Sequence, residues 1–242
     1  SDMKNVTVVH GESSDVEKLF FLLKIPSADI IFADLGVSSH QFDTDERGFS
    51  FSNDGPLDMR MNIENKTTAG DLIKEKTVEE LQNILSRFAQ ERESKKVARA
   101  LKNAVENGAD TTFEIRDAVN AAKRYGKKRN NAHLAKIFMA LRMAVNDETG
   151  QLEKMLKSGF KLLSENGVMG ILTFHSVEDR IVKRFFRDRK NSVSMDDETE
   201  YCGDVEVSGP FNPSEEEISK NSRSRSARLR ILRKNNKNKR RQ

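Results

Sequence analysis

Apolar residues along this chain fall into short continuous or alternating runs and into longer stretches with helical spacing. The short runs predict strands at residues 6–9, 29–33, 168–174 and 228–232. Helical spacing predicts helices over 15–23, from 71 to 107, over 111–124, 132–163 and 175–189. A helix that ends at Asn166-Gly167 and leads into a strand is half of a βαβ unit, so the pattern favours an α/β fold with a parallel sheet.

One long segment, from Leu35 to about Asn65, has little periodicity and is rich in Gly, Asp and Ser. It follows the buried run that ends at Asp34. Loops longer than about 15 residues inside a compact domain are uncommon and tend to be functional. Ligands of open α/β sheets bind outside the carboxyl ends of the strands. The sequence therefore predicts a binding loop directly after Asp34.

The region 67–128 is predicted to be a compact helical insert with a small core of its own. Two capping boxes open helices in it, Thr77 with Glu80 and Thr111 with Glu114. The α/β core is then discontinuous, over 1–66 and 129–233, and 234–242 forms a basic tail. Two further stretches predict irregular structure, a polar basic connector over 125–131 and a polar loop over 191–221.

Composition narrows the class of protein. The 242 residues are 36% hydrophobic and 33% charged, as in ordinary globular proteins. No apolar run approaches the roughly 18 residues that span a bilayer, and no signal-peptide pattern is present. The single cysteine, Cys202, excludes an internal disulfide and a cysteine-rich metal site. These features predict a cytoplasmic protein.

The formal net charge of +4 is unevenly distributed. From Lys220 to Gln242 there are eleven Lys or Arg residues and no acid, and the preceding part carries 31 basic and 38 acidic residues. Such basic segments bind phosphates or remain solvated tails. Charge alone leaves these two interpretations equally open.

Three signatures together resemble one known family. The first is Asp34-Leu-Gly-Val-Ser-Ser39 with Gln41, followed by Arg47-Gly-Phe-Ser-Phe51 and Gly55-Pro-Leu-Asp-Met-Arg-Met61; the others are 174–185 and 221–230. In this order and spacing the chain resembles, over nearly its whole length, the small-subunit ribosomal RNA cytosine-N4 methyltransferases of the MraW type.

The resemblance implies a Rossmann-like class I methyltransferase sheet and methyl transfer from S-adenosylmethionine to a cytidine amine. It implies small-subunit ribosomal RNA, or the assembled small subunit, as partner, with the helical insert on the RNA side and no metal. Cofactor contacts are expected from Asp34, Gly36 and Gln41, and Asp34 is also a candidate acceptor for the amine. Candidate RNA contacts are Ser38, Ser39, Arg47, Arg60, His175, Arg180 and Arg225. The oligomeric state stays open, a dimer included.

Several candidates have structural alternatives. Asp34 could cap a turn, and His175 could be a general base, an RNA contact or a strand-end residue. Ser176 with Asp179 could cap the following helix. Some arginines could pair with acids nearby. The chain also departs from the family at Ser13, where a phenylalanine is usual, and at 136–139, where an Arg-Thr-Phe-Gln run is expected.

A class I methyltransferase also needs a strand with a Gly-rich turn and, one strand later, an acid for the ribose. No stretch of this sequence fits them. In the family's usual strand order, 3-2-1-4-5-7-6, the run at 6–9 corresponds to strand 3. The sequence thus predicts an incomplete sheet without its first strands, an N-terminally truncated chain, and weak cofactor binding. The alternatives are a non-catalytic RNA-binding remnant and a metal-dependent phosphoesterase using Asp34, Asp43, Asp45 and His175.

Overall fold

The computed structural model describes residues 5–122, 127–191 and 205–235. The chain divides into two compact units, which we describe separately. Unit 1 comprises Ser1–Gly36 and Thr149–Gln242, and unit 2 comprises Val37–Glu148. The region 67–128, predicted to be a helical insert, lies entirely within unit 2. No helix among the described residues is long and apolar enough to cross a membrane.

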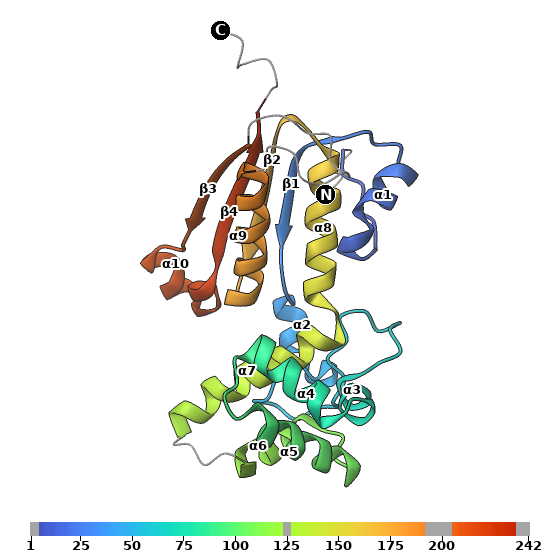
Figure 1. Cartoon of the computed structure of the whole chain (residues 1–242), viewed down its shortest axis with the longest axis vertical. Helices are drawn as coiled ribbons and strands as arrows, with labels where there is room; N and C mark the ends of the chain where they lie inside the picture. Colours follow the sequence, from blue (N-terminus) through green and yellow to red (C-terminus); the bar gives the residue numbers. More distant parts are fainter. Residues whose placement is uncertain (1–4, 123–126, 192–204, 236–242) are drawn as a thin grey trace. The chain divides into compact units, whose positions relative to one another are not determined.

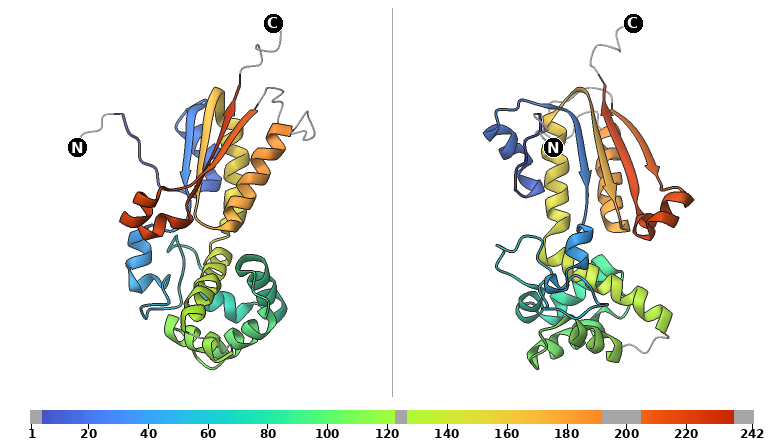
Figure 2. Two further views of the ribbon diagram at one scale, coloured as in Figure 1. Left: turned by 90° about the vertical axis from the view of Figure 1, so that its left-hand side faces the viewer. Right: turned by 180° about the vertical axis from the view of Figure 1, so that it is seen from behind.

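Unit 1 is built on a sheet with the strand order β1-β2-β4-β3 (Figure 2). Its strands are β1 (Ala28–Asp34), β2 (Leu163–Thr173), β3 (Val205–Phe211) and β4 (Arg228–Lys234). β1 and β2 are parallel, whereas β4 runs antiparallel to both of its neighbours. The expected α/β fold with a parallel strand pair is therefore confirmed.

Helices cover one face of this sheet (Figure 1). They are α8 (Glu148–Leu162) and α9 (Ser176–Asn191), and α1 (Val16–Leu22), preceded by η1 (Ser13–Asp15), lies beside α8. The core between helices and strands contains Phe160, Phe186, Met169, Ile171 and Leu232. Gly159 lets α8 approach closely, because a Cβ there would lie 2.9 Å from the methyl carbon of Met169.

The opposite face of the sheet is apolar and open in unit 1. The side chains of Ile30 and Phe32 are 73% and 59% exposed, and the Phe32 ring lies against Gly170. The outer edge of β1 pairs with no other strand in the described part of the chain. Parallel strands are normally covered on both faces. β1 thus lies at the edge of the sheet but has the apolar residues of a strand from the middle of a sheet, as expected for an incomplete sheet.

Two predictions about unit 1 are wrong. The run at 6–9 forms no strand, and Val8 is 90% exposed, because a strand needs a partner for its backbone groups and none lies beside it. The stretch 191–221 is not all loop, since it contains β3 and α10 (Glu215–Lys220), followed by η4 (Ser222–Ser226). Because this stretch is polar and contains Gly and Pro, its sequence did not indicate the edge strand β3. Residues 192–204 lie outside the described part of the chain.

Unit 2 is a helical body joined to the long loop. Its helices are α2 (Ser39–Asp43), η2 (Asp45–Arg47), α3 (Ala69–Glu75), α4 (Val78–Ile84), η3 (Leu85–Ala89), α5 (Ser94–Glu106), α6 (Thr112–Ala122) and α7 (Lys127–Val145). Its core contains Leu81, Leu101, Ile115, Ile137 and Leu141, and the last two lie outside the predicted insert 67–128.

Local signals explain where the helices of unit 2 begin and end. The capping boxes at Thr77 and Thr111 are present, and Thr68 with Asp71 forms a third that was not predicted. The helical spacing from 71 to 107 is interrupted by the left-handed residue Gln90. The predicted connector is helical from Lys127, while 123–126 lie outside the described residues.

Candidate functional site

In unit 1 the candidate site begins at the carboxyl ends of β1 and β2. Asp34 is in register with Leu172, and the Leu35 amide donates to the Leu172 carbonyl at 3.1 Å. Because the two strands are parallel, the residues that follow Leu172 emerge at the same edge as Asp34. The Asp34 side chain is exposed, and it has no hydrogen bond or ion pair with any described residue. Its carboxylate is therefore available to a ligand.

Gly36 lets the chain turn away from the strand end. Its φ of +96° lies in a region that favours glycine, and no atom lies within 4 Å of where a Cβ would be. The backbone after Asp34 is thus both strongly turned and open on one side. An α/β sheet receives ligands at this kind of position.

In unit 2, Ser38 and Gln41 form the capping box of α2. The Ser38 hydroxyl accepts from the Gln41 amide at 3.2 Å, and the Gln41 side-chain oxygen accepts from the Ser38 amide at 3.1 Å. This box starts a short helix at Ser39. The polar pattern that marks the first signature therefore has a structural role at these two residues, whatever else they contact.

Two arginines hold the long loop of unit 2 together. Arg60 donates to both oxygens of Asp58 at 2.7 Å and to the carbonyls of Ile63 and Asn65. Arg47 donates from Nη2 to the carbonyls of Arg60 and Met61 at 2.6 and 3.1 Å. Burial raises the pKa of Asp58, but the hydrogen bonds and charge of Arg60 outweigh it and leave this pKa below its ordinary value.

These contacts explain how a segment with little regular structure keeps one conformation. Backbone carbonyls without a helix or sheet partner need other donors, and the guanidinium groups supply them. Arg47 and Arg60, expected from the resemblance to contact RNA, are already engaged within the loop. Their pairing with a nearby acid was the alternative suggested by the sequence, and Arg60 follows it.

His175 in unit 1 is tied to Glu178. The His175 Nε2 atom lies 3.2 Å from a Glu178 carboxylate oxygen, and the Glu178 amide lies 3.4 Å from His175 Nδ1. The other carboxylate oxygen accepts from the Phe174 amide at 3.0 Å. Both ring nitrogens thus face one residue. The Nε2 atom is buried and makes no hydrogen bond to the described residues, so all three interpretations of His175 stay open.

Asp179 does not cap the start of α9 but pairs with β4. Its carboxylate accepts from Arg230 at 2.7 and 3.2 Å and from Arg228 at 3.1 Å. Sequence reasoning missed this cluster. The available signal was the alternation of Arg228 and Arg230, which places both side chains on one face of a strand.

Arg180 and Arg225, the remaining candidates for RNA contact, are exposed. Neither forms an ion pair among the described residues. Their side chains are consistent with a solvent-facing role and with contact to a phosphate.

The fold and the turn after Asp34 define an α/β protein with an exposed acid at the strand ends. Comparison with known proteins is more specific: the model of the MraW methylase family matches residues 1–235, and the chain belongs to this family. Three similar relatives are each named ribosomal RNA small subunit methyltransferase H. They come from Sorangium cellulosum (40% identical over 229 residues, 94% of this chain and 69% of the relative), Geotalea daltonii (39% over 240, 96% and 77%) and Wolbachia of Drosophila simulans (41% over 220, 90% and 73%).

Proposed function

We propose that this protein transfers a methyl group from S-adenosylmethionine to the N4 amine of a cytidine in small-subunit ribosomal RNA, in the cytoplasm. The observation that carries the proposal is the exposed Asp34 carboxylate beside the turned Gly36 at the end of a parallel strand. Membership of a methylase family and the names of the relatives support the reaction and the substrate. The helical region 67–128 is assigned to the RNA side.

The reaction needs alignment more than covalent chemistry. S-adenosylmethionine supplies an electrophilic methyl group on a positively charged sulfur. In the transfer, the N4 nitrogen would bond to this carbon, sulfur would keep the electron pair of the broken carbon–sulfur bond, and the amine proton would pass to the Asp34 carboxylate or to water. The amine lone pair is conjugated into the cytosine ring, so an acceptor that polarises the N–H group and fixes its direction accelerates the step.

The residues at the strand end fit the reacting part of this chemistry. A carboxylate at Asp34 attracts the positive sulfonium centre and can accept a hydrogen bond from the amine. The space beside Gly36 leaves room for a ligand to approach the backbone. Ser38 and Gln41 fix the first turn of α2, and Arg47 with Arg60 fix the loop that follows. We assign these four residues to positioning, with Gln41 retained as a cofactor contact.

The test is transfer of a tritiated methyl group to undermethylated small ribosomal subunits by the protein expressed from its own gene. We expect Asp34→Ala and Asp34→Asn to reduce transfer at least 100-fold. Asp29→Asn is the matched control, because Asp29 lies on the same strand and is exposed, with its carboxylate bound to Ser164. Unchanged transfer by Asp34→Ala would remove the central assignment.

A further inference from the structure

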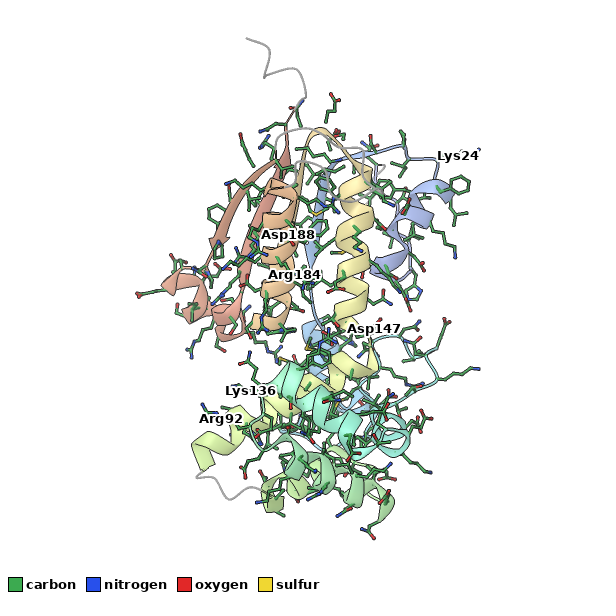
Figure 3. All side chains as sticks on the ribbon, in the orientation of Figure 1. Lys24, Arg92, Lys136, Asp147, Arg184 and Asp188 are labelled. Atoms are coloured by element: carbon green, nitrogen blue, oxygen red, sulfur yellow. The ribbon has the colours of Figure 1, made fainter. Side chains whose placement is uncertain are left out.

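The two long helices of unit 1 present a second surface, on the side of the helices that faces away from the sheet. In α8, Leu152, Met155 and Leu156 face the core, and in α9 Val182 and Phe186 do so. The opposite sides carry exposed cations: Lys154, Lys157 and Lys161 on α8, and Arg180, Arg184 and Arg187 on α9. We call these six residues the cationic face. Figure 3 labels Arg184 on it, with Asp188 close by on the same helix.

The two rows of cations belong to one surface, because α8 and α9 pack side by side. Arg184 of α9 lies 3.2 Å from Glu153 of α8, and the Phe160 and Phe185 rings stack edge to face at 6.2 Å. Packed helix axes lie about 8–10 Å apart. In each row the first and last cations are seven residues apart, or about 10 Å at the helical rise. Cations therefore lie along about two turns of each helix.

Acids balance this charge only in part: Glu12 and Glu17 accept from Gln151 and Ser158 of α8, and two further acids pair with arginines of the face. Arg184 pairs with Glu153, and Arg187 pairs with its neighbour Asp188 at 3.0 Å. All four of these side chains are at least 44% exposed, and such exposed pairs are weak. Both arginines can therefore exchange their partner for a stronger anion. Lys154, Lys157, Lys161 and Arg180 form no ion pair with any described residue.

The six cations combine two kinds of helical spacing, because Lys157 lies four residues after Glu153 and Arg184 lies four residues before Asp188, where opposite charges meet. Lys157 and Lys161, like Arg180 and Arg184, are four residues apart, where like charges destabilise a helix. Elsewhere the chain uses the stabilising arrangement, with a lysine and a glutamate four residues apart in Lys76–Glu80, Lys102–Glu106 and Glu216–Lys220. The cationic face also lies in the part of the chain before Lys220, in which acidic residues outnumber basic ones.

We propose that the cationic face of α8 and α9 binds the phosphate backbone of the ribosomal RNA substrate. The inference rests on the proposed function for the identity of the RNA. A surface of this charge is complementary to a polyanion such as RNA. Two rows of Lys and Arg on helix surfaces, with no element that could enter a groove and contact base edges, suit contact to phosphates rather than to bases. The face would position the RNA independently of sequence and add affinity that salt weakens.

The experiment measures binding of the 242-residue chain to a fluorescent small-subunit ribosomal RNA fragment, by anisotropy between 50 and 300 mM salt. The variant is Lys157→Gln with Arg180→Gln and Arg187→Gln. We expect at least a tenfold loss of affinity at 100 mM salt, and a slope of log K against log salt that is smaller in magnitude by about two. The control removes three exposed cations outside the face, in Lys18→Gln, Lys24→Asn and Lys66→Gln.

Affinity and slope that change equally in both variants, or in neither, would overturn the proposal. So would a variant that loses binding to vesicles containing 30% phosphatidylserine while its RNA binding stays unchanged, because the face would then fit a lipid surface. Thermal unfolding of each variant shows whether the fold is retained. The result is separable from methyl transfer: a protein that binds this RNA through the face and methylates no small subunit refutes only the proposed function.

Discussion

The carboxylate of Asp179 and the guanidinium of Arg230 form a two-point ion pair, with distances of 2.7 and 3.2 Å between partner atoms. Both side chains are less than 10% exposed. The pair joins α9 to β4, and so joins the second signature of the sequence to the third across about fifty residues. Two motifs that looked like separate functional segments are one structural connection in unit 1.

We predict that Asp179→Asn destabilises the protein by about 3 kcal/mol, because Arg230 stays buried without a counter-charge. The measurement is the free energy of unfolding of unit 1 in urea. Asp188→Asn is the matched control, since Asp188 is exposed and pairs with its own neighbour, and we expect a change below about 0.5 kcal/mol. Equal effects of the two substitutions would refute the assignment.

The same pair has a pH signature. Burial raises the pKa of Asp179, but the hydrogen bonds and charges of Arg230 and Arg228 lower it further, so its pKa in the folded state lies below the ordinary value. A carboxyl group whose pKa is lower in the folded state stabilises the fold at a pH above its unfolded pKa of about 4. This stabilisation is lost as the pH falls through the pKa of the folded state. The stability difference between the wild type and Asp179→Asn should therefore shrink in acid.

Lys234 predicts a second pH dependence, of the same sign but at alkaline pH. Its side chain is 6% exposed, donates to the Leu163 carbonyl at 2.7 Å and lies 4.5 Å from the centre of the Phe160 ring. Burial, with the charge of Arg189, lowers its pKa to about 8. Between pH 8 and the unfolded value near 10.5 the unfolded chain binds more protons, so stability rises with pH.

The test compares the wild type with Lys234→Met in urea at pH 7.5 and pH 10. Relative to the variant, the wild type should gain about 2 kcal/mol over this interval. Groups that titrate in both proteins cancel in the difference. A constant difference between the two proteins would mean that the lysine keeps an ordinary pKa in the folded state.

The loop of unit 2 has a glycine that no other residue can replace. Gly48 has a φ of +67°, and a Cβ there would collide with the carbonyl of Pro56. We expect Gly48→Ala to destabilise unit 2 by more than about 2 kcal/mol. Gly36→Ala is the control for backbone conformation alone, because the φ of Gly36 is also positive but a Cβ there would meet no neighbour. We expect this control to lose about 1 kcal/mol of stability. A Gly48→Ala protein as stable as Gly36→Ala would contradict the close approach.

The sequence predicted the elements that rest on local signals. Capping boxes at Thr77 and Thr111, the helix stop at Asn107-Gly108 and the apolar strand β1 lie where the pattern places them. The strand predicted at 168–174 is present as part of β2, but β2 begins at Leu163, before the helix end predicted at Asn166-Gly167. Two of the wrong predictions concern elements that depend on distant partners. Val6–Val9 has strand-like residues and nothing to pair with, whereas β3 contains Gly and Pro but gains a ladder along β4.

The candidate site was predictable in type but not in detail. An acid and a glycine at a strand end can be recognised from order alone, and both residues lie where expected. Which arginines are available cannot be read from spacing, because Arg60 and Arg230 are held by acids and Arg47 by carbonyl groups of the loop. Residue type predicted their charge, and only the packing determined which of them face solvent.

The open edge of β1 leads to a prediction for cofactor binding. Nucleotide cofactors bound at the ends of an α/β sheet need a strand followed by a Gly-rich turn, and the sequence contains no such turn. Beside β1, no described residue pairs with the strand edge where this element would be placed. We expect the 242-residue chain to bind S-adenosylmethionine with a Kd weaker than about 0.1 mM in isothermal titration calorimetry. Any residual heat should disappear in Asp34→Ala, whereas saturation at micromolar concentrations would show that these residues suffice for the cofactor.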